Sequence, residues 1–410
     1  MERIYGLLGR LLGHSWSVPI HKALGCEGYR LIELEPEALG GFLRREDTGG
    51  LNVTIPYKRE VMKFCDEIDP AARNIGSVNT LVRRGGKLYG YNTDIDGFLY
   101  MLRRAGISPA GKKVLILGSG GASLTAQAAA RMEGAREVVV ISRSGPDSYE
   151  NLPERHGDAE VLVNATPVGM WPHMEGSPID LRLLPALEAV ADVIYNPGRT
   201  GLLLQAEALG IRRAGGLPML VHQAKRAEEL FFDASIPDGE TENIAAQLWR
   251  DMTNLVLTGM PGSGKTTVGR ALAALSGKPF TDLDEEIVKR AGKPIPEIFA
   301  REGEGAFRDL EVQVLAETCA QSGQIIATGG GAVLREENRT AMRRTGRVYR
   351  LCRRLEDLPT AGRPLSQAGK LEEMERVRGP LYEAAADRDI WNDKSPAETA
   401  GQIWRDFCEQ

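Results

Sequence analysis

The sequence contains little cysteine. Its five cysteines are scattered among 410 residues, and no two of them form a Cys-x-x-Cys pair. An odd, scattered set of thiols is typical of reduced cytosolic proteins and argues against a disulfide framework or a structural zinc site. The sequence also lacks an apolar run long enough to cross a bilayer, and its first residues lack the apolar core of a signal peptide. We therefore expect a cytoplasmic protein with no membrane partner.

Positive charge is not in excess either. The 51 Lys and Arg residues are outnumbered by 56 Asp and Glu residues, which gives a formal net charge of −5. This balance gives no reason to expect nucleic acid or an anionic membrane as a partner. An anionic small-molecule substrate would therefore have to be bound by local Lys and Arg side chains. The composition is ordinary for a globular protein, and the length predicts about two or three domains.

A phosphate-binding sequence lies in the second half of the chain. The apolar run 255–257 is followed by Gly259-Met260-Pro261-Gly262-Ser263-Gly264-Lys265-Thr266-Thr267 and then by a helix-like segment, 268–275. A strand, a GxxxxGK[ST] loop and a helix in this order predict a P-loop, although a glycine-rich turn is the alternative. The backbone N–H groups from Gly262 to Thr267 would surround phosphate oxygens. Lys265 can reach the outer phosphates, and the Thr266 hydroxyl can bind Mg²⁺.

A second nucleotide-binding pattern lies between residues 106 and 216. The apolar run 113–117 is typical of a buried parallel strand and leads into Gly118-Ser119-Gly120-Gly121-Ala122 and an alanine-rich helix. This loop has GxGG but not the third glycine of GxGxxG, so by itself it only indicates a dinucleotide site. The next strand, 137–141, ends in Ser142-Arg143-Ser144, where an NAD enzyme normally carries Asp or Glu. Arg and Ser suit a 2′-phosphate, which favours NADP.

Polar side chains follow the predicted strands of the first 105 residues. Because open α/β sheets bind ligands at the carboxyl ends of their strands, we expect these side chains to converge: Asn52, Thr54, Lys58, Asn79 and Asp94. A Lys–Asp pair in such a cleft can pass a proton to a carbonyl oxygen as hydride reaches the carbon, although a surface salt bridge is the alternative. Ser15 and Ser17 precede a predicted helix and can either bind a carboxylate or cap that helix.

Residues 1–250 resemble shikimate dehydrogenase. The resemblance rests on Ser15-x-Ser17, Asn52–Lys58, Val78–Thr80, Asn92–Asp94, Gly118–Ala122, Asn164–Thr166, Tyr195–Leu203 and Pro218–Ala224, in order and at family spacing. It implies that Ser15, Ser17 and Tyr195 bind the substrate carboxylate, that Thr54, Asn79 and Gln223 bind its ring oxygens, and that Lys58 and Asp94 form the catalytic dyad. It also implies that Thr166, Val193 and Gly216 contact the cofactor. Two positions depart from the family: Val18 stands where proline is usual, and Ser142-Arg143-Ser144 replaces Asn-Arg-Thr.

Charged residues at the ends of predicted elements mark a further site after the P-loop. Asp282 and Asp284 follow a short strand, where one carboxylate suits the Mg²⁺ shell and the other can orient or deprotonate an attacking hydroxyl. Arg308 is expected to open a helix, and Arg378 to restart another helix before Pro380. The segment 325–332 is a strand that runs into three glycines, where backbone can approach a ligand closely. Taken singly, such arginines are most often solvated.

Residues 253 to about 405 resemble shikimate kinase. The motifs are the P-loop, Asp282-x-Asp284, Phe307-Arg308-x-x-Glu311, Gly329-Gly330-Gly331, Arg363-Pro364-Leu365 and Arg378-x-Pro380-Leu381-Tyr382. The resemblance implies that shikimate is bound by Asp284, Arg308, Gly330 and Arg378, with both arginines on its carboxylate. It implies that Arg363 closes over the phosphates and that Asp282 and Thr266 serve Mg²⁺. The family often has another arginine shortly before Arg-Pro-Leu, whereas this chain has 358–362, Leu-Pro-Thr-Ala-Gly.

These patterns predict an α/β protein with three domains. A substrate domain, 1–105 completed by helices of about 217–250, would precede a Rossmann-like NADP domain, 106–216, and a P-loop kinase domain of the nucleotide-monophosphate-kinase type, 253–410. The two resemblances imply a bifunctional enzyme of aromatic amino acid biosynthesis. It would reduce 3-dehydroshikimate with NADPH and then phosphorylate shikimate with ATP and Mg²⁺, using Lys58, Asp94, Lys265 and Asp284 as catalytic residues.

Two alternatives stay open. The first half can prefer quinate over shikimate. The whole chain can also be a quinate or shikimate sensor or regulator built from inactive copies of the same domains. The sensor predicts the loss of residues that carry chemistry, yet Lys58, Asp94, Lys265, Asp284 and Arg308 are all present. The sequence does not indicate the oligomeric state.

Overall fold

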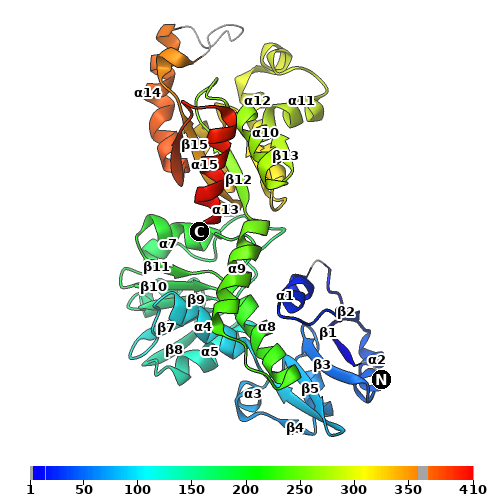
Figure 1. The fold of residues 1–410 in the computed structure, drawn as a ribbon. Coiled ribbons are helices and arrows are strands. Elements are labelled where there is room, and N and C mark those ends of the chain that lie inside the picture. The colour runs from blue at the N-terminus through cyan, green and yellow to red at the C-terminus, as the bar shows by residue number, and fades with distance from the viewer. Residues whose placement is uncertain (1–2, 14, 359–367, 410) are drawn as a thin grey trace. The chain divides into compact units, whose positions relative to one another are not determined.

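The computed structural model describes residues 3–13, 15–358 and 368–409, and these residues form three β-sheets with flanking helices (Figure 1). The chain divides into two compact units, which are residues 1–195 with 200–245, and residues 246–410 with 196–199. The predicted α/β class is confirmed. Within the described ranges, no helix is both long enough and apolar enough to span a membrane.

The first sheet of unit 1 is mixed, with strand order β2-β1-β3-β5-β6-β4. Strand β1 pairs in parallel with β2 and β3, whereas β5 pairs antiparallel with β3 and β6. The six strands are β1 (Ile4–Gly9), β2 (Tyr29–Glu33), β3 (Thr48–Val53), β4 (Glu67–Ile68), β5 (Thr80–Arg84) and β6 (Lys87–Tyr91). The elements between and after them are α1 (Ser17–Ala23), α2 (Pro36–Leu43), the 3₁₀ turn η1 (Glu60–Phe64), α3 (Pro70–Ile75) and α4 (Asp94–Arg104).

A later helix, α8 (Leu217–Phe232), completes this part of unit 1. A Cβ on Gly50 of β3 would lie 2.2 Å from the Phe231 ring, and one on Gly97 of α4 would lie 2.5 Å from the Met219 carbonyl. Both contacts are closer than a side chain allows, so glycine at these two positions lets α8 pack directly against β3 and α4. This packing brings residues after 217 beside the first sheet.

The second sheet of unit 1 is fully parallel, with strand order β11-β10-β9-β7-β8. Its strands are β7 (Lys113–Leu117), β8 (Glu137–Ile141), β9 (Val161–Asn164), β10 (Ala189–Asp192) and β11 (Arg212–Ala214). Its helical elements are α5 (Gly121–Met132), α6 (Leu152–His156), η2 (Leu181–Leu183) and α7 (Gly201–Ala208). Val114 and Ile116 pack with α4 and α5, while Leu115 and Leu117 pack with α7 on the other face. Burial on both faces explains the unbroken apolar run of β7.

Unit 2 holds the third sheet, which is parallel with strand order β13-β14-β12-β15-β16. Its strands are β12 (Asn254–Thr258), β13 (Phe280–Asp282), β14 (Ile325–Ala327), β15 (Gly346–Cys352) and β16 (Arg388–Trp391). Helix α9 (Asp238–Met252) precedes β12. The helices that follow are α10 (Lys265–Ser276), α11 (Leu283–Ala291), α12 (Ile295–Cys319), α13 (Glu336–Thr345), α14 (Ala368–Ala385) and α15 (Pro396–Cys408), with 3₁₀ turns η3 (Ala332–Leu334) and η4 (Leu355–Asp357).

One predicted helix start in unit 2 is wrong. Arg378 does not restart a helix, because α14 begins at Ala368 and continues through Pro380. A proline inside a helix costs a backbone hydrogen bond and usually marks a boundary. Here Leu371 and Tyr382, on either side of it, are both buried in the core of the unit. Packing of these side chains outweighs the local preference. Arg308 lies soon after Gly303, whose positive φ of 84° breaks the helical conformation inside α12.

Candidate active sites of the two units

Unit 1 contains a pocket of about 320 Å³, a size suited to a small ligand, which borders the carboxyl ends of β3 and β10. Asn79, predicted to follow a strand, instead precedes β5, whose antiparallel course brings its amino end to the same edge. The pocket contains all the predicted substrate-binding and dyad residues of this unit, and three of its predicted cofactor contacts also line it. The lining residues are Leu7, Ser15, Ser17, Asn52, Val53, Thr54, Lys58, Asn79, Asp94, Ala122, Val193, Tyr195, Gly216, Met219, Leu220 and Gln223. Residues far apart in the sequence are therefore brought together around one cavity.

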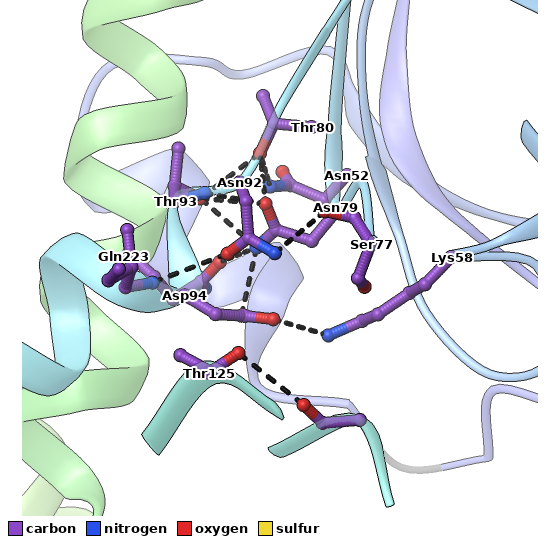
Figure 2. A network of polar contacts seen from close by, with 12 residues as sticks. Asn52, Lys58, Ser77, Asn79, Thr80, Asn92, Thr93, Asp94, Thr125 and Gln223 are labelled. Carbon is purple, nitrogen blue, oxygen red and sulfur yellow. Dashed lines mark hydrogen bonds and ion pairs between the residues drawn. The ribbon is translucent and has the colours of Figure 1, made fainter. Parts of the chain in front are cut away.

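Lys58 and Asp94 form an ion pair in this pocket. The Lys58 Nζ lies 2.6 Å from Asp94 Oδ2, and the two side chains are 27% and 17% exposed. Asp94 is the first residue of α4, and its other oxygen accepts a hydrogen bond from Asn79 Nδ2 at 2.8 Å. Figure 2 shows the lysine and the carboxylate pointing toward each other beside this network. The pair places an ammonium proton donor at the pocket and holds it with a carboxylate whose position is itself fixed.

Asn79 is at the centre of the network in Figure 2. Its Oδ1 accepts hydrogen bonds from the Thr93 backbone N–H (2.7 Å) and the Thr80 hydroxyl (3.0 Å). Its Nδ2 donates to Asp94, and Gln223 Oε1 lies 3.5 Å away. Since donors on one side and an acceptor on the other fix the amide, Asn79 presents a single orientation to a ligand. Such preorganisation favours one arrangement of ligand hydroxyl groups.

Ser15 and Ser17 line the pocket, and Ser15 also contacts the start of α1. Trp16 occupies the N-cap of α1 and makes no side-chain capping bond. The Ser15 hydroxyl lies 3.1 Å from the Ser17 hydroxyl and accepts a hydrogen bond from the Ser17 backbone N–H at 3.2 Å. Ser17 is the first residue of α1, so the Ser15 hydroxyl satisfies one of the free N–H groups at this helix start, while both serines line the pocket.

The GxGG loop joins β7 to α5. Gly118 has a positive φ of 99°, and a Cβ there would lie 3.0 Å from both the Ala165 carbonyl and Thr166 Cγ2, so glycine is required where this loop meets the end of β9. Ser119, Gly120 and Gly121 are exposed at the start of α5. This helix start can bind a phosphate through its free N–H groups.

The loops after β9 and β10 are tied together by a buried carboxylate. Asp192 accepts hydrogen bonds from Asn164 Nδ2 (3.0 Å), the Ile194 backbone N–H (3.1 Å) and the Thr200 hydroxyl (2.7 Å). Asn164 in turn accepts from the Thr166 hydroxyl at 2.7 Å. Burial raises the pKa of Asp192 to about 6, against the lowering effect of these donors. This carboxylate therefore fixes both the predicted cofactor contact Thr166 and the strand end before Val193.

Val193 and Gly216, two of the predicted cofactor contacts that line the pocket, lie against each other. A Cβ on Gly216 would lie 2.1 Å from the Val193 carbonyl, so only glycine allows the start of α8 to approach the end of β10. The Ser142–Arg143 pair follows β8 directly, and Arg143 is exposed. An exposed guanidinium at the carboxyl end of a parallel strand suits a phosphate group.

The P-loop of unit 2 joins β12 to α10, as predicted. Lys265 is 8% exposed, and its Nζ donates to the carbonyls of Gly259 (2.8 Å) and Met260 (3.0 Å). The Thr266 hydroxyl donates to Asp282 Oδ2 at 2.7 Å. A hydroxyl beside a carboxylate supplies the oxygen ligands that Mg²⁺ prefers. Thr267 follows, exposed in the first turn of α10.

A second group of charged residues surrounds the glycine triplet 329–331. A Cβ on Gly329 would lie 2.8 Å from Asp284 Oδ1, and one on Gly331 would lie 2.4 Å from the Arg308 guanidinium. The Gly330 carbonyl accepts hydrogen bonds from Arg378 Nη1 (3.0 Å) and the Tyr382 hydroxyl (2.5 Å). Two guanidinium groups and a carboxylate thus lie around one backbone loop. Arg363 lies outside the described residues.

Two carboxylates of this group have altered acidity. Burial, and next the negative charge of the neighbouring Asp282, raise the pKa of Asp284. Burial also raises the pKa of Glu311, whose Oε2 accepts from Arg308 Nη1 at 2.8 Å. A raised pKa makes Asp284 a better proton acceptor once it is ionised. Glu311 fixes Arg308. Its place in the Phe-Arg-x-x-Glu motif, one helical turn after the arginine, is the signal that could have identified this contact.

Asn392 is a P-loop contact that no sequence motif indicated. It follows β16, its Nδ2 donates to the Ser263 carbonyl at 2.7 Å, and its Oδ1 accepts from Thr399 at 2.9 Å. A Cβ on Gly264, where φ is 96°, would lie 2.4 Å from this amide. Asn392 therefore packs against the P-loop and holds the Ser263 carbonyl in place.

We expect Asn392→Ala to raise the KM for ATP about fivefold, the effect of losing a hydrogen bond worth about 1 kcal/mol. Steady-state phosphorylation kinetics measure this change. Asn254→Ala is the matched control, because Asn254 is also buried, lies at the start of β12 and donates a hydrogen bond to the Cys319 carbonyl. An equal rise in KM in the control would show a general loss of stability instead.

Comparison with known proteins gives matches to both units. The family model for the shikimate dehydrogenase substrate binding domain matches residues 7–81, and the family model for shikimate kinase matches residues 261–407. A shikimate dehydrogenase (NADP(+)) from Clostridium beijerinckii is 35% identical over an alignment of 260 residues, and the match covers 58% of this chain and 96% of the relative.

Two solved structures resemble the same part of the chain. A chorismate mutase/shikimate 5-dehydrogenase fusion protein from Clostridium acetobutylicum is 36% identical with a TM-score of 0.58, and the match covers 60% of this chain and 97% of that one. Shikimate 5-dehydrogenase from Thermus thermophilus, solved in complex with NADP(H) and shikimate, is 34% identical with a TM-score of 0.54 and matches over 60% and 99%.

Proposed function

We propose that this chain, which belongs to the shikimate dehydrogenase family and carries a shikimate kinase domain in the same polypeptide, catalyses two consecutive steps of aromatic biosynthesis. The first is reduction of 3-dehydroshikimate to shikimate with NADPH, and the second is phosphorylation of the shikimate 3-hydroxyl with MgATP. The observation that carries the proposal is the pocket in which all eight predicted substrate and dyad residues of unit 1 meet. The proposed domains are 1–105 with helices of about 217–250, 106–216 and 253–410.

In the proposed reduction, NADPH supplies the hydride. Lys58 donates a proton to the carbonyl oxygen as it becomes an alkoxide, and Asp94 holds the ammonium group 2.6 Å away. The Ser15 and Ser17 hydroxyls, with Tyr195, bind the carboxylate of the substrate. Thr54, Asn79 and Gln223 bind its ring oxygens, so the carbonyl is held beside Lys58.

The preference for NADPH would depend on Arg143. We expect Arg143→Ala to raise the KM for NADPH about tenfold, because a charge-assisted hydrogen bond to the 2′-phosphate is lost. The KM for NADH should not change, since NADH lacks that phosphate. Arg136→Ala is the matched control, because Arg136 is also an exposed arginine next to β8. Arg136 precedes this strand, whereas Arg143 follows it. Equal losses with NADPH and NADH would contradict the assignment.

In the proposed phosphorylation, Arg308 and Arg378 bind the substrate carboxylate. Asp284 orients the attacking 3-hydroxyl group or accepts its proton. Lys265 and the P-loop N–H groups stabilise the charge of the transferring phosphoryl group. The Thr266 hydroxyl and the Asp282 carboxylate fit Mg²⁺, which neutralises phosphate charge when bound. Catalysis here depends mainly on positioning the two substrates and on stabilising the charge of the transferring phosphoryl group.

The alternatives differ in substrate and in turnover. A quinate-preferring first unit would reduce 3-dehydroquinate faster than 3-dehydroshikimate, so kcat/KM for the two ketones with NADPH tests the proposed substrate directly. We expect 3-dehydroshikimate to be preferred. A regulator would bind shikimate without turning it over, and the intact Lys58–Asp94 and Thr266–Asp282 contacts argue against it. A cytoplasmic location is part of the proposal.

A further inference from the structure

A buried His–Glu pair lies behind the unit 1 pocket. His21 Nδ1, on α1, is hydrogen-bonded to Glu228 Oε1, on α8, and both side chains are 1% exposed. Nothing in the proposed reduction uses either group. Among the described residues, His21 Nε2 and Glu228 Oε2 have no hydrogen-bond partner. Buried polar atoms without partners are costly, and an apolar pair of similar volume would often be at least as stable. The pair therefore calls for an explanation other than stability.

Glu228 differs in this respect from its neighbour Glu229. Glu229 is also buried, but it pairs with Lys225 and Arg226 and accepts from the Ile236 backbone N–H at 2.9 Å. Glu228 has His21 as its ion-pair partner within the described part of the chain. The buried hydrogen bond between α1 and α8 is thus formed by one histidine and one carboxylate.

Both helices carry pocket residues close to the pair. Ser17 lies one helical turn before His21 on the same face of α1. Gln223 lies about one and a half turns before Glu228 on α8. Ser17 and Gln223 both line the pocket. Fixing His21 to Glu228 therefore fixes the separation of two side chains that would contact the same ligand.

The pair also reaches the pocket through Tyr29 and Asn52. The Tyr29 ring stacks on the His21 ring, with centroids 3.7 Å apart and planes at 5°. The Tyr29 hydroxyl donates to Asn52 Oδ1 at 2.8 Å, and Asn52 lines the pocket. Because its oxygen is occupied by Tyr29, the Asn52 amide nitrogen is left to donate toward Thr80, 3.4 Å away, and the pocket.

We propose that His21 and Glu228 are a positioning pair. They fix the shape of the ketone-binding side of the pocket by holding α1, α8 and Asn52 in constant relative positions. This inference rests on the proposed function of unit 1. The residues that the pair positions, Ser17, Gln223 and Asn52, lie on the side assigned to the ring and carboxylate of the substrate. Among the described residues, no hydrogen bond joins the dinucleotide loop 118–122 to this pair. The pair thus acts on substrate binding and not on cofactor binding.

The test uses the full chain with Glu228→Ala, His21→Ala and the double substitution. We expect each single change to raise the KM for 3-dehydroshikimate about tenfold, because Ser17, Gln223 and Asn52 would no longer be held in place for the ligand; tenfold corresponds to about 1.4 kcal/mol of binding free energy. The KM for NADPH and the phosphorylation rate should stay at wild-type values, and kcat should change far less than KM. The double variant should be no worse than the singles, because residues that act as one unit are not additive.

Glu229→Ala is the matched control, since it removes a buried carboxylate one residue away on the same helix. An equal rise in the ketone KM in this control, an unchanged KM in Glu228→Ala, or additive effects in the double variant would overturn the inference. If Glu228→Ala does not fold, Glu228→Leu decides, because leucine fills a similar volume and removes the acceptor: a raised ketone KM supports the pair and an unchanged one overturns it. A wild-type chain without reductase activity would instead overturn the proposed function, and the inference with it.

Discussion

Replacement of Lys58 by alanine should lower kcat for reduction of 3-dehydroshikimate about a thousandfold, within the range for loss of a positioned proton donor. Lys58 is the ammonium group paired with Asp94 in the unit 1 pocket, and its side chain is only 27% exposed. Without it, water would have to protonate the forming alkoxide. Phosphorylation of added shikimate should proceed at the wild-type rate. Stopped-time assays of NADPH oxidation and of ADP release measure the two activities separately.

Lys63→Ala is the matched control for this prediction. Lys63 lies five residues further along the same segment, is 70% exposed, and pairs with Glu60 at the surface. It should keep both activities, because an exposed pair of this kind contributes little to stability. Retention of reductase activity in Lys58→Ala would remove Lys58 from the proposed chemistry and leave the ion pair as a structural contact.

Replacement of Lys265 by methionine should lower kcat for phosphorylation of shikimate about a thousandfold, as expected when a charge-stabilising donor is lost from a phosphoryl-transfer site. Methionine keeps the length of the side chain and removes the charge. Lys265 is buried in the P-loop, where its ammonium group donates hydrogen bonds to two loop carbonyls. Reduction of 3-dehydroshikimate should be unaffected.

The control for Lys265 is Lys289→Met. Lys289 is 77% exposed on α11 and pairs with Glu286 one turn away. It should retain both activities. Full phosphorylation by Lys265→Met would contradict the assignment of the P-loop, and loss of both activities would point to a general folding defect.

The sequence predicted the parts of each site that are encoded locally. The P-loop lies between a strand and a helix because GxxxxGK[ST] and its apolar flanks specify that turn within a few residues. Thr54 could be placed at the pocket because it follows β3, whose carboxyl end borders the pocket. Asn79 reaches the same pocket for a reason that the sequence did not predict: it precedes β5, which runs antiparallel to β3, so its amino end lies beside the carboxyl end of β3. The α/β class followed from the same alternation of strand and helix patterns.

Contacts made across long sequence separations could not be predicted. Asn392 reaches the P-loop from 129 residues away, and Glu228 reaches His21 from 207 residues away, with no local motif around either residue. The continuation of α14 through Pro380 depends on packing of Leu371 and Tyr382 in the core, which local preference does not contain. The contact of the Ser15 hydroxyl with the first N–H group of α1, beside the pocket, also required the structure.

The most direct test of the bifunctional account is a single assay on the purified full chain. The chain is given 3-dehydroshikimate, NADPH and MgATP, and NADPH oxidation and shikimate 3-phosphate are followed together. We predict that both signals appear, that Lys58→Ala removes both from this mixture, and that Lys265→Met removes only the phosphorylated product. Oxidation of NADPH by the wild-type chain without shikimate 3-phosphate would contradict the proposed second step. Binding of shikimate with neither signal would contradict the enzyme and favour the regulator.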